Sequence, residues 1–383
     1  MKVLFLTNIP SPYRVDFFSE LGKLCDLTVI YEREAASDRN TSWKGQAEDT
    51  FRQIFLKGKK VGTDNSFSWE IIKYLRQERY DHYIVGMYST FTAMLAILYF
   101  RWKKIPYILN TDGGFISEDS FLKERIKRYF IGGAAYWLST GQNANRYLIH
   151  YGAKEERIYT YPFSSLREED IRQEESKDFL LKERARQELK IQEKKMILSV
   201  GQMIHRKGMD VLIRGAALLD REVGVYLIGG EPNEEVCGLV EELNLTNVHF
   251  PGFMTKERLQ EYYKAADLFV LPTREDIWGL VINEAMAQGL PIITTRHCGA
   301  GLELVEEGIN GFLVEKEDEQ ALANRIQLVL ENEKLRESMS EASLKKIEAY
   351  TVHKMAKRHE KILSKLKNEE KQGEGNHMWT SLK

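Results

Sequence analysis

The sequence has little of what marks several large classes of protein. Three cysteines occur in 383 residues, Cys25, Cys237 and Cys298, without paired spacing, so we expect neither a disulfide framework nor a zinc site. The net charge of −2 lacks the basic excess of a nucleic-acid-binding protein, and we expect no nucleic-acid partner. No apolar run reaches transmembrane length, and the chain starts on a strand pattern instead of a signal peptide, which predicts a cytoplasmic protein.

Two short motifs are also missing. No Gly-x-Gly-x-x-Gly follows the first strand of either half, which disfavours an NAD-dependent dehydrogenase. No Asp-x-Asp pair is present to hold a divalent ion, so the sequence predicts no metal site and no cofactor. What the chain does have is an ordinary globular composition, 43% hydrophobic and 29% charged, over a length sufficient for two domains with separate cores.

Apolar segments of strand length alternate with helical patterns along both halves of the chain. Such alternation predicts parallel sheets with right-handed crossovers, which is an α/β fold. The predicted strands are 3–8, 26–31, 51–56, 82–86, 106–110, 135–140 and 158–162, followed by 196–200, 223–229, 248–251, 267–271, 291–295 and 311–314. Residues 32–65 are polar and irregular with one short strand, and we interpret them as a loop region.

A change of composition divides the chain. Residues 166–195 are strongly charged with few apolar positions, and we interpret them as a linker with a surface helix. They separate an N-terminal domain, residues 1–165, from a C-terminal domain, residues 196–350. A last helix is predicted at about 351–368, and the polar residues 369–383 are expected to form a flexible tail.

The most informative stretch is residues 267–289. Its first five residues predict a buried strand, a Pro-Thr pair ends that strand, and helical spacing begins at about Gly279. An acidic turn therefore lies at the carboxyl end of a parallel strand, where open α/β sheets bind ligands. The amides of Gly279, Leu280 and Val281 open the helix and form an expected anion site.

Two carboxylates accompany this anion site. Asp276 lies just before the helix, and Glu284 lies about one turn inside it, where its oxygens can accept hydrogen bonds from sugar hydroxyls. Amide donors for phosphate and carboxylate acceptors for hydroxyls are together what a sugar nucleotide requires. The alternative is an ordinary amphipathic helix with a charged entry turn.

This stretch resembles the Glu-x7-Glu motif of the retaining GT-B glycosyltransferases of family 4, with Asp276 in place of the first Glu. The resemblance implies a GT-B fold, in which two Rossmann-like doubly wound domains face each other across a cleft. It also implies that the helix at 351–368 crosses back onto the first domain. In such an enzyme Asp276 would hold hydroxyls of the donor sugar and Glu284 those of the ribose, although Asp reaches less far than Glu.

Residues 200–208, Val-Gly-Gln-Met-Ile-His-Arg-Lys-Gly, resemble the phosphate site Gly-Arg-x4-Lys-Gly of the same family. Gly201 lets the backbone leave the strand sharply. Lys207, expected to begin the next helix, matches the family lysine, whereas Gln202 stands at the arginine position. Arg206 brings a cation four residues later, and both cations would offset charge on a departing nucleoside diphosphate. A solvated basic pair is the alternative.

Two further glycine turns follow strands of the second half. Gly230 belongs to a double glycine, which permits close approach of the backbone to a ligand. Gly252 and Phe253 lie at the next strand end, where the family binds the base through backbone groups. The resemblance therefore places all three residues beside the donor.

Residues 8–14, Asn-Ile-Pro-Ser-Pro-Tyr-Arg, resemble the opening of many bacterial polysaccharide glycosyltransferases. Arg14 is a candidate contact for acceptor phosphate or donor diphosphate, and a helix-face salt bridge is the alternative. Asp112 and Gly113 stand where many family members have His-Gly beside the transferred sugar. His205 is a candidate substitute, and an ordinary surface histidine is the simpler interpretation.

Two segments combine apolar or aromatic residues with cations. They are residues 91–104, which end in Arg-Trp-Lys-Lys, and residues 121–130. Such patches can lie on anionic membranes, and the resemblance implies this for members that extend lipid-linked glycans. The pattern allows peripheral contact with the inner face of the plasma membrane, but it slightly favours the alternative, a buried sheet-covering helix with a cationic end.

These observations together predict retaining, metal-independent transfer of a sugar from a nucleoside-diphosphate sugar to a hydroxyl of a glycan or lipid-linked glycan in bacterial surface-polysaccharide synthesis. Two other functions stay open. A nucleotide-sugar 2-epimerase has the same fold, although no matching histidine pattern is present. The substitutions at Gln202 and Asp112 also allow a non-catalytic protein that binds a nucleotide sugar or acts as a scaffold.

Overall fold

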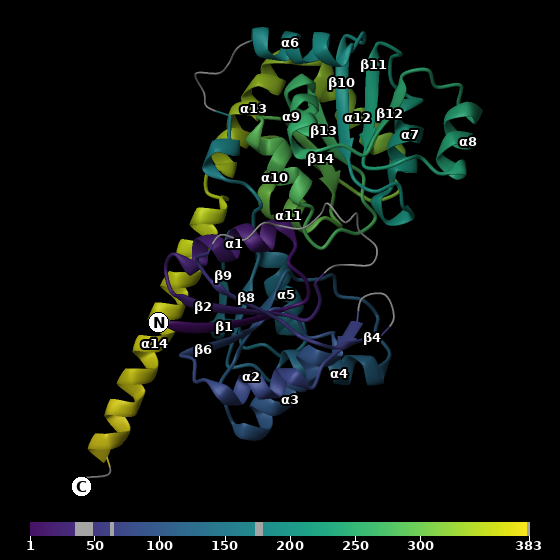
Figure 1. Ribbon diagram of the computed structural model, residues 1–383. Helices are drawn as coiled ribbons and strands as arrows, with labels where there is room; N and C mark the ends of the chain where they lie inside the picture. The colour runs from purple at the N-terminus through teal and green to yellow at the C-terminus, as the bar shows by residue number, and fades with distance from the viewer. Residues whose placement is uncertain (35–48, 62–64, 173–178, 381–383) are drawn as a thin grey trace. The chain divides into compact units, whose positions relative to one another are not determined.

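The computed structural model describes residues 1–34, 49–61, 65–172 and 179–380. These residues form two compact units, each built on its own parallel sheet (Figure 1). Unit 1 comprises Met1–Ser165 and Thr351–Lys383, and unit 2 comprises Leu166–Tyr350.

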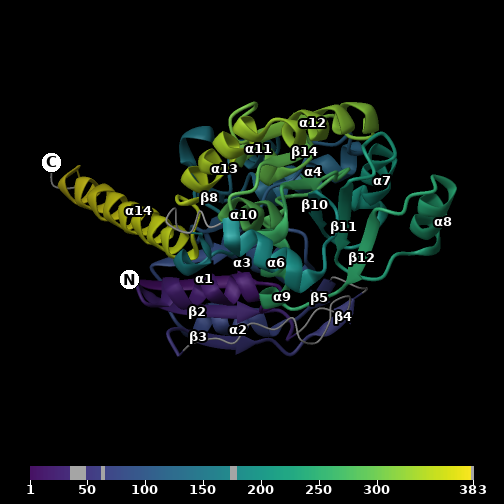
Figure 2. The ribbon, with the colours of Figure 1, turned by 90° about the horizontal axis from the view of Figure 1, so that it is seen from above.

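Unit 1 contains a seven-stranded parallel sheet in the order β3-β2-β1-β6-β7-β8-β9. Its strands are β1 Lys2–Thr7, β2 Asp26–Tyr31, β3 Arg52–Phe55, β6 His82–Val85, β7 Ile108–Thr111, β8 Tyr136–Ser139 and β9 Ile158–Thr160. Its helices are α1 Pro12–Gly22, α2 Glu70–Gln77, α3 Phe91–Lys103, α4 Phe121–Ile131, α5 Gln142–His150 and α14 Val352–Thr380. The last helix packs on α1, and Figures 1 and 2 show it continuing as one long helix beyond the sheet.

Unit 2 contains a six-stranded parallel sheet in the order β12-β11-β10-β13-β14-β15. Its strands are β10 Lys195–Val200, β11 Val223–Ile228, β12 Val248–Gly252, β13 Leu268–Leu271, β14 Ile292–Thr295 and β15 Gly311–Val314. Its helices are α6 Phe179–Leu189, α7 Met209–Ala216, α8 Glu234–Glu242, α9 Lys256–Ala265, α10 Leu280–Ala287, α11 Gly299–Leu304, α12 Glu319–Glu331 and α13 Glu333–Ile347. Side chains of α7, α8 and α12 form one core cluster with the strands.

The strands form where the sequence places continuous apolar runs. Every residue of β13 is fully buried, and so are Val3 and Phe5 of β1. Helices cover both faces of such parallel strands, so no polar alternation is needed. All thirteen strands of the two large sheets lie within two residues of their predicted positions.

The segments between the regular elements differ more from expectation. The region predicted to hold one short strand contains β3 and also the antiparallel pair β4 Lys59–Val61 and β5 Asn65–Phe67, while residues 35–48 lie outside the described residues. The last helix continues past residue 368 to Thr380, because its Glu-Glu-Lys-Gln extension consists of good helix formers. Much of the segment expected to form a flexible tail is therefore helical. Leu166 to Arg172 and α6 belong to unit 2, and residues 173–178 lie outside the described residues.

The strand order fixes where a ligand would bind in each sheet. The order changes direction between β10 and β13 in unit 2, and between β1 and β6 in unit 1. Open α/β sheets bind ligands at the carboxyl ends of the strands beside such a switch point. In unit 2 the segments that leave these two adjacent strands are 201–208 and 272–279, so the fold brings the two principal motifs together.

Candidate active site

An ion pair lies at the switch point of unit 2. Lys207 Nζ donates to Asp276 Oδ2, and both side chains are only about one-eighth exposed, 13% and 12%. Arg206 Nη1 lies 3.7 Å from Asp276 Oδ1 and also donates to the carbonyl of Glu275 at 2.8 Å. Three of the four predicted catalytic side chains therefore meet in one place, with Arg206 on the more exposed side.

The two turns that carry this pair are joined through their backbones. Thr273 Oγ1 and the Arg274 amide both donate to the carbonyl of Arg206, each at 2.9 Å. Gly208 has a left-handed φ of +66°, and a Cβ there would overlap the carbonyl oxygen of Pro272. Only glycine permits this approach.

One prediction about the first turn is wrong. A helix was expected to begin at Lys207, whereas the structure places that residue in a 3-10 turn, His205–Lys207, and starts α7 at Met209. The left-handed conformation of Gly208 separates the two. The Lys207 side chain consequently points back along Gly201, where a Cβ would lie 3.5 Å from Lys207 Cδ.

Arg274 holds the two turns in place, and no sequence motif indicated this role. Its guanidinium pairs with Asp210 of α7 at 2.6 Å and with Glu317, and it donates to the carbonyl of His205 at 2.7 Å. The hydrogen bond to Asp210 is the principal cause of a raised pKa for Arg274. The ring of His205 is on the exposed side of the turn, which agrees with the simpler interpretation of a surface histidine.

The start of α10 lies beside the Asp276 carboxylate. Ile282 N donates to Gly279 O at 2.9 Å, so the amides of Gly279, Leu280 and Val281 precede the first hydrogen bond of the helix and form its positive end. Gly279 has a φ of +95°, and a Cβ there would lie 2.9 Å from Cys298 Sγ and 3.5 Å from Asp276 Oδ2. Cys298 is thus a packing residue under the turn, and burial raises the pKa of its thiol to about 12.

Glu284 lies further along α10. The buried Tyr263 of α9 donates its hydroxyl to Glu284 Oε2 at 3.0 Å. Burial raises the pKa of Glu284, and it also raises that of Tyr263. Nothing in the sequence pattern links α9 to this carboxylate, because the contact joins residues 21 positions apart on different helices.

The other predicted donor-binding residues lie on turns at the same edge of the sheet. Gly230 and Gly252 have φ of +138° and +83°, Phe253 is exposed, and Gln202 is exposed beside Gly201. The other glycine of the predicted double glycine, Gly229, has a φ of +143°, and its Cβ would overlap the carbonyl oxygen of Gly201. It is Gly229, not Gly230, that the packing of these turns requires.

In unit 1, Arg14 and Asp112 also form an ion pair. Arg14 Nη2 lies 2.6 Å from Asp112 Oδ1, with the arginine buried and the aspartate partly exposed. Burial by itself would lower the pKa of Arg14, but the Asp112 charge raises it overall. Gly113 takes a φ of +100° and packs against Ala144. The pair lies after β1 and β7, at the carboxyl edge of this sheet, and it favours the salt-bridge interpretation of Arg14.

Residues 182–346 match the family model described as glycosyl transferases group 1. This span contains both turns of the site and all the residues discussed in unit 2. Most of unit 2 is therefore similar to the glycosyl transferases group 1 family.

Relatives of this domain are named glycosyltransferases. An uncharacterized glycosyltransferase of Methanocaldococcus jannaschii is 32% identical over 145 residues, which is 38% of this chain and 40% of that protein. The N,N'-diacetylbacillosaminyl-diphospho-undecaprenol alpha-1,3-N-acetylgalactosaminyltransferase of Campylobacter jejuni is 24% identical over 285 residues, which is 70% of this chain and 73% of the relative. The match to the first of these relatives thus spans less than half of its length.

The fold as a whole has solved counterparts. Anabaena Alr3699/HepE in complex with UDP aligns with a TM-score of 0.77 over 95% of this chain and 100% of its own, at 19% identity. The likeness confirms the predicted GT-B type of fold, in which one Rossmann-like domain precedes a second. No group of three or more His, Cys, Asp or Glu side chains in the described ranges is placed to hold a metal ion.

Proposed function

We propose that the protein is a hexosyltransferase that transfers a sugar from a nucleoside-diphosphate sugar to a hydroxyl of a glycan or lipid-linked glycan, with retention of anomeric configuration. The observation that carries the proposal is the Lys207–Asp276 pair beside the amino end of α10. A cation, a carboxylate and free helix amides at a switch point are the groups that a sugar diphosphate requires.

Each group has a distinct task in this reaction. The donor diphosphate competes with Asp276 for Lys207, so donor binding frees the aspartate to accept hydrogen bonds from sugar hydroxyls. Lys207, with Arg206 and the α10 amides, then stabilises charge that develops on the leaving diphosphate. Glu284 accepts hydrogen bonds from the ribose. A diphosphate oxygen takes the acceptor proton on the same face of the sugar, so no protein base is needed.

The names of the relatives support the wider role. The Campylobacter relative is named for transfer to a diphospho-undecaprenol acceptor, and the Anabaena protein was solved with UDP bound. The proposal therefore includes a lipid-linked acceptor, surface-polysaccharide synthesis as a family 4 enzyme, and work at the inner face of the plasma membrane without a metal ion or cofactor.

Donor hydrolysis and thermal shift across UDP-, GDP-, ADP- and TDP-sugars, with and without EDTA, test the proposal. We expect one donor to raise the melting temperature and to be cleaved slowly, unaffected by EDTA. Lys207→Ala and Glu284→Ala should each lose most of this cleavage without unfolding, because both side chains lie on the ligand edge of the sheet. Lys334→Ala, an exposed lysine of α13, is the matched control.

The same assay separates the alternatives. Near wild-type cleavage in either site variant would remove the assignment. A donor that is converted to its 2-epimer without acceptor identifies an epimerase, and a donor that binds without any turnover identifies a binding or scaffold protein.

A further inference from the structure

A buried tyrosine of α9 contacts the carboxylate to which the proposed function assigns the ribose. Tyr263 is 2% exposed, and the centre of its ring lies 5.9 Å from that of Phe269 in β13. Its hydroxyl donates to Glu284 Oε2 at 3.0 Å and lies 3.4 Å from the carbonyl oxygen of Val281. The packed ring therefore holds one hydroxyl against the face of α10 that carries both residues, which lie three positions apart.

This contact orients the carboxylate and leaves most of it available. In the described part of the chain, no other group donates a hydrogen bond to the Glu284 side chain. An ionised carboxylate has about four acceptor positions, so one bond from Tyr263 leaves room for two hydroxyls of a ligand. A carboxylate whose orientation is fixed by a buried donor is prepared for such a ligand before it arrives.

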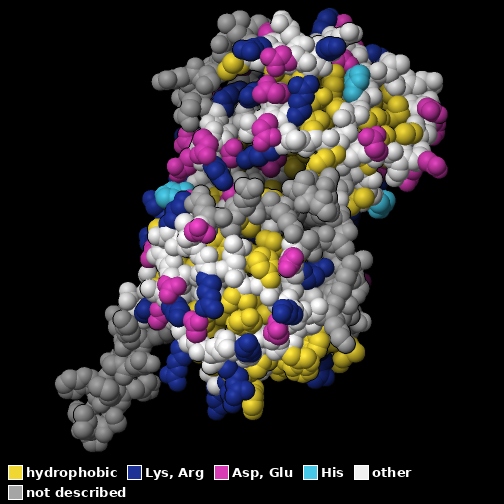
Figure 3. Space-filling view, in the orientation of Figure 1, with side chains coloured by type: hydrophobic (Ala, Val, Ile, Leu, Met, Phe, Trp, Pro, Cys, Tyr) yellow, Lys and Arg dark blue, Asp and Glu magenta, His cyan; other side chains and the backbone are white. Residues whose placement is uncertain are grey.

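The carboxylate must also be charged, because a protonated carboxyl group loses acceptor capacity. Burial raises the pKa of Glu284, and the hydrogen bond from Tyr263 opposes this shift. Among the described residues, the charges of Lys256 on α9 and Asp170 before α6 act on Glu284 with opposite signs. These two residues pair with each other at 3.1 Å, and Figure 3 shows cations beside acids over this face of unit 2. Tyr263 is thus the principal group that favours the charged form.

We propose that Tyr263 is a positioning residue whose hydroxyl fixes the Glu284 carboxylate to accept the 2′- and 3′-hydroxyls of a ribose, which makes the site selective for ribonucleoside donors over 2′-deoxyribonucleoside donors. A site built to accept a hydroxyl discriminates against an analogue that lacks it, because the buried acceptor is then left unpaired. This role rests on the proposed function and narrows its donor class. Among the donors named above, it disfavours TDP-sugars, whose pentose is 2′-deoxyribose.

Isothermal titration calorimetry with UDP, GDP and ADP, and with their 2′-deoxy counterparts, tests this role. The wild type should bind one ribonucleotide about tenfold or more tightly than its 2′-deoxy form. Tyr263→Phe should weaken the ribonucleotide about tenfold and the 2′-deoxy form much less, because a hydrogen bond to a charged group contributes roughly that factor. The pH at which ribonucleotide affinity falls on acidification should also rise in this variant, since Glu284 loses the bond that opposes its protonation.

A double-mutant cycle separates positioning from packing. Glu284→Gln keeps the shape of the side chain and removes its charge, so the pH dependence of ribonucleotide affinity that Glu284 causes should disappear. Adding Tyr263→Phe to Glu284→Gln should then weaken binding by about threefold or less, because the two residues act as one unit. Equal losses from Tyr263→Phe in both backgrounds would show that the tyrosine only supports the fold of α9, and would overturn the proposal.

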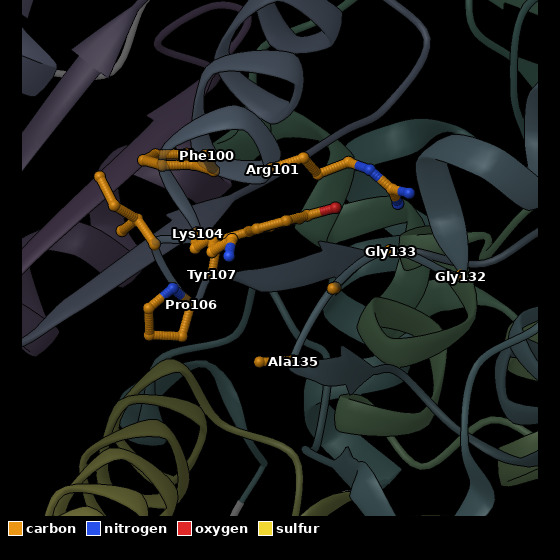
Figure 4. A pocket seen from close by; sticks show the side chains of 10 residues that line it. Phe100, Arg101, Lys104, Pro106, Tyr107, Gly132, Gly133 and Ala135 are labelled. Atoms are coloured by element: carbon orange, nitrogen blue, oxygen red, sulfur yellow. The ribbon is translucent and has the colours of Figure 1, made fainter.

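Two other buried tyrosines provide matched controls. Tyr262→Phe changes the neighbouring residue of α9, which is 8% exposed. Tyr107→Phe changes unit 1, where a pocket of about 470 Å³, lined by Arg101 and Lys104 among others, opens just before β7 and β8 (Figure 4). In Figure 4 the hydroxyl of Tyr107 points toward Arg101. Both control variants should bind nucleotides as the wild type does.

The outcomes distinguish the role of Tyr263 from the proposed function. If the wild type binds no nucleotide of the series, the proposed function fails and this role fails with it. If Tyr263→Phe binds the ribonucleotide as well as the wild type, or if the 2′-deoxy form binds the wild type equally tightly, only the role of Tyr263 is wrong. The second comparison needs no variant, so it holds even where a substitution prevents folding. Loss of binding in Tyr107→Phe would place the nucleotide in the pocket of unit 1 and overturn both.

Discussion

Gly208 is the residue on which the turn after β10, residues 201–208, depends. Its φ of +66° is left-handed, and any Cβ would overlap Pro272 O. Gly208→Ala should therefore destabilise unit 2 by about 2 kcal/mol or more, through backbone strain and the displaced turn, and should lower donor hydrolysis at least tenfold because Lys207 moves with it. Urea unfolding and the hydrolysis assay measure the two effects.

A second glycine provides the comparison at this scale. Gly238 lies within α8, and a Cβ there would meet no atom within 4 Å. Gly238→Ala should stabilise the domain by roughly 0.5–1 kcal/mol, since alanine loses less entropy in a helix. Equal behaviour of the two variants would show that the turn does not need its glycine.

Some residues of the site could be predicted from the sequence, and others could not. Lys207, Asp276 and Glu284 were found because their spacing follows a motif next to a strand end. Arg274 and Tyr263 were missed, because their roles depend on tertiary contacts. Arg274 pairs with Asp210 and Glu317, and Tyr263 donates to Glu284. Those contacts join residues far apart in the chain, and neither residue belongs to a pattern.

At the scale of elements, a buried carboxyl group links β2, β5 and α3. Glu32 is 2% exposed and accepts hydrogen bonds from Ser66 at 3.0 Å and from Thr90 at 2.5 Å. Thr90 in turn caps α3 by accepting from the Ala93 amide at 3.3 Å. Burial raises the pKa of Glu32 to about 7, although the hydrogen bonds from Thr90 and Ser66 lower it, so burial favours the protonated form of Glu32 over the charged one.

The sign of the resulting pH dependence follows from that raised pKa. The folded state holds the proton more tightly than the unfolded chain, so Glu32 lowers the stability of unit 1 as pH rises from about 4.5 to about 7. We expect a loss on the order of 2 kcal/mol in the wild type over this window. Glu32→Gln should remove that part of the slope in urea unfolding, and parallel pH curves for the two proteins would contradict the account.

The regular elements were largely predictable, whereas their irregular neighbours were not. Buried parallel strands are visible in the sequence as apolar runs. The bounds of β1 and β13 therefore lie within one residue of the predicted bounds. The β4–β5 pair was not predicted, because both strands are short and most of their residues are polar. The start of α7 was predicted at the wrong residue, because the conformation of Gly208 depends on Pro272. That residue lies 64 positions later, so no local pattern reveals the contact.

At the scale of the whole molecule, the chain order makes the two units unequal. Unit 2 is continuous, from Leu166 to Tyr350, whereas unit 1 is completed by α14 from the other end of the chain. The ring of His359 lies 4.6 Å from that of Phe17 and 4.3 Å from that of Tyr161. Leu363 and Leu366 are fully buried, and the Leu363 carbonyl lies 2.9 Å from His82 Nε2.

A chain that ends at Tyr350 should therefore lose unit 1 and keep unit 2. Each large apolar side chain withdrawn from the core costs about 1.5–3 kcal/mol, and α14 buries several, so their sum is comparable to the whole stability of a domain. Residues 1–350 should show a cooperative melting transition for unit 2 alone, still raised by the donor, as should residues 166–350 expressed separately. Loss of the donor-dependent transition in both fragments would mean that unit 2 depends on unit 1 for its fold. A melting transition of unit 1 that is unchanged in residues 1–350 would mean that α14 is dispensable.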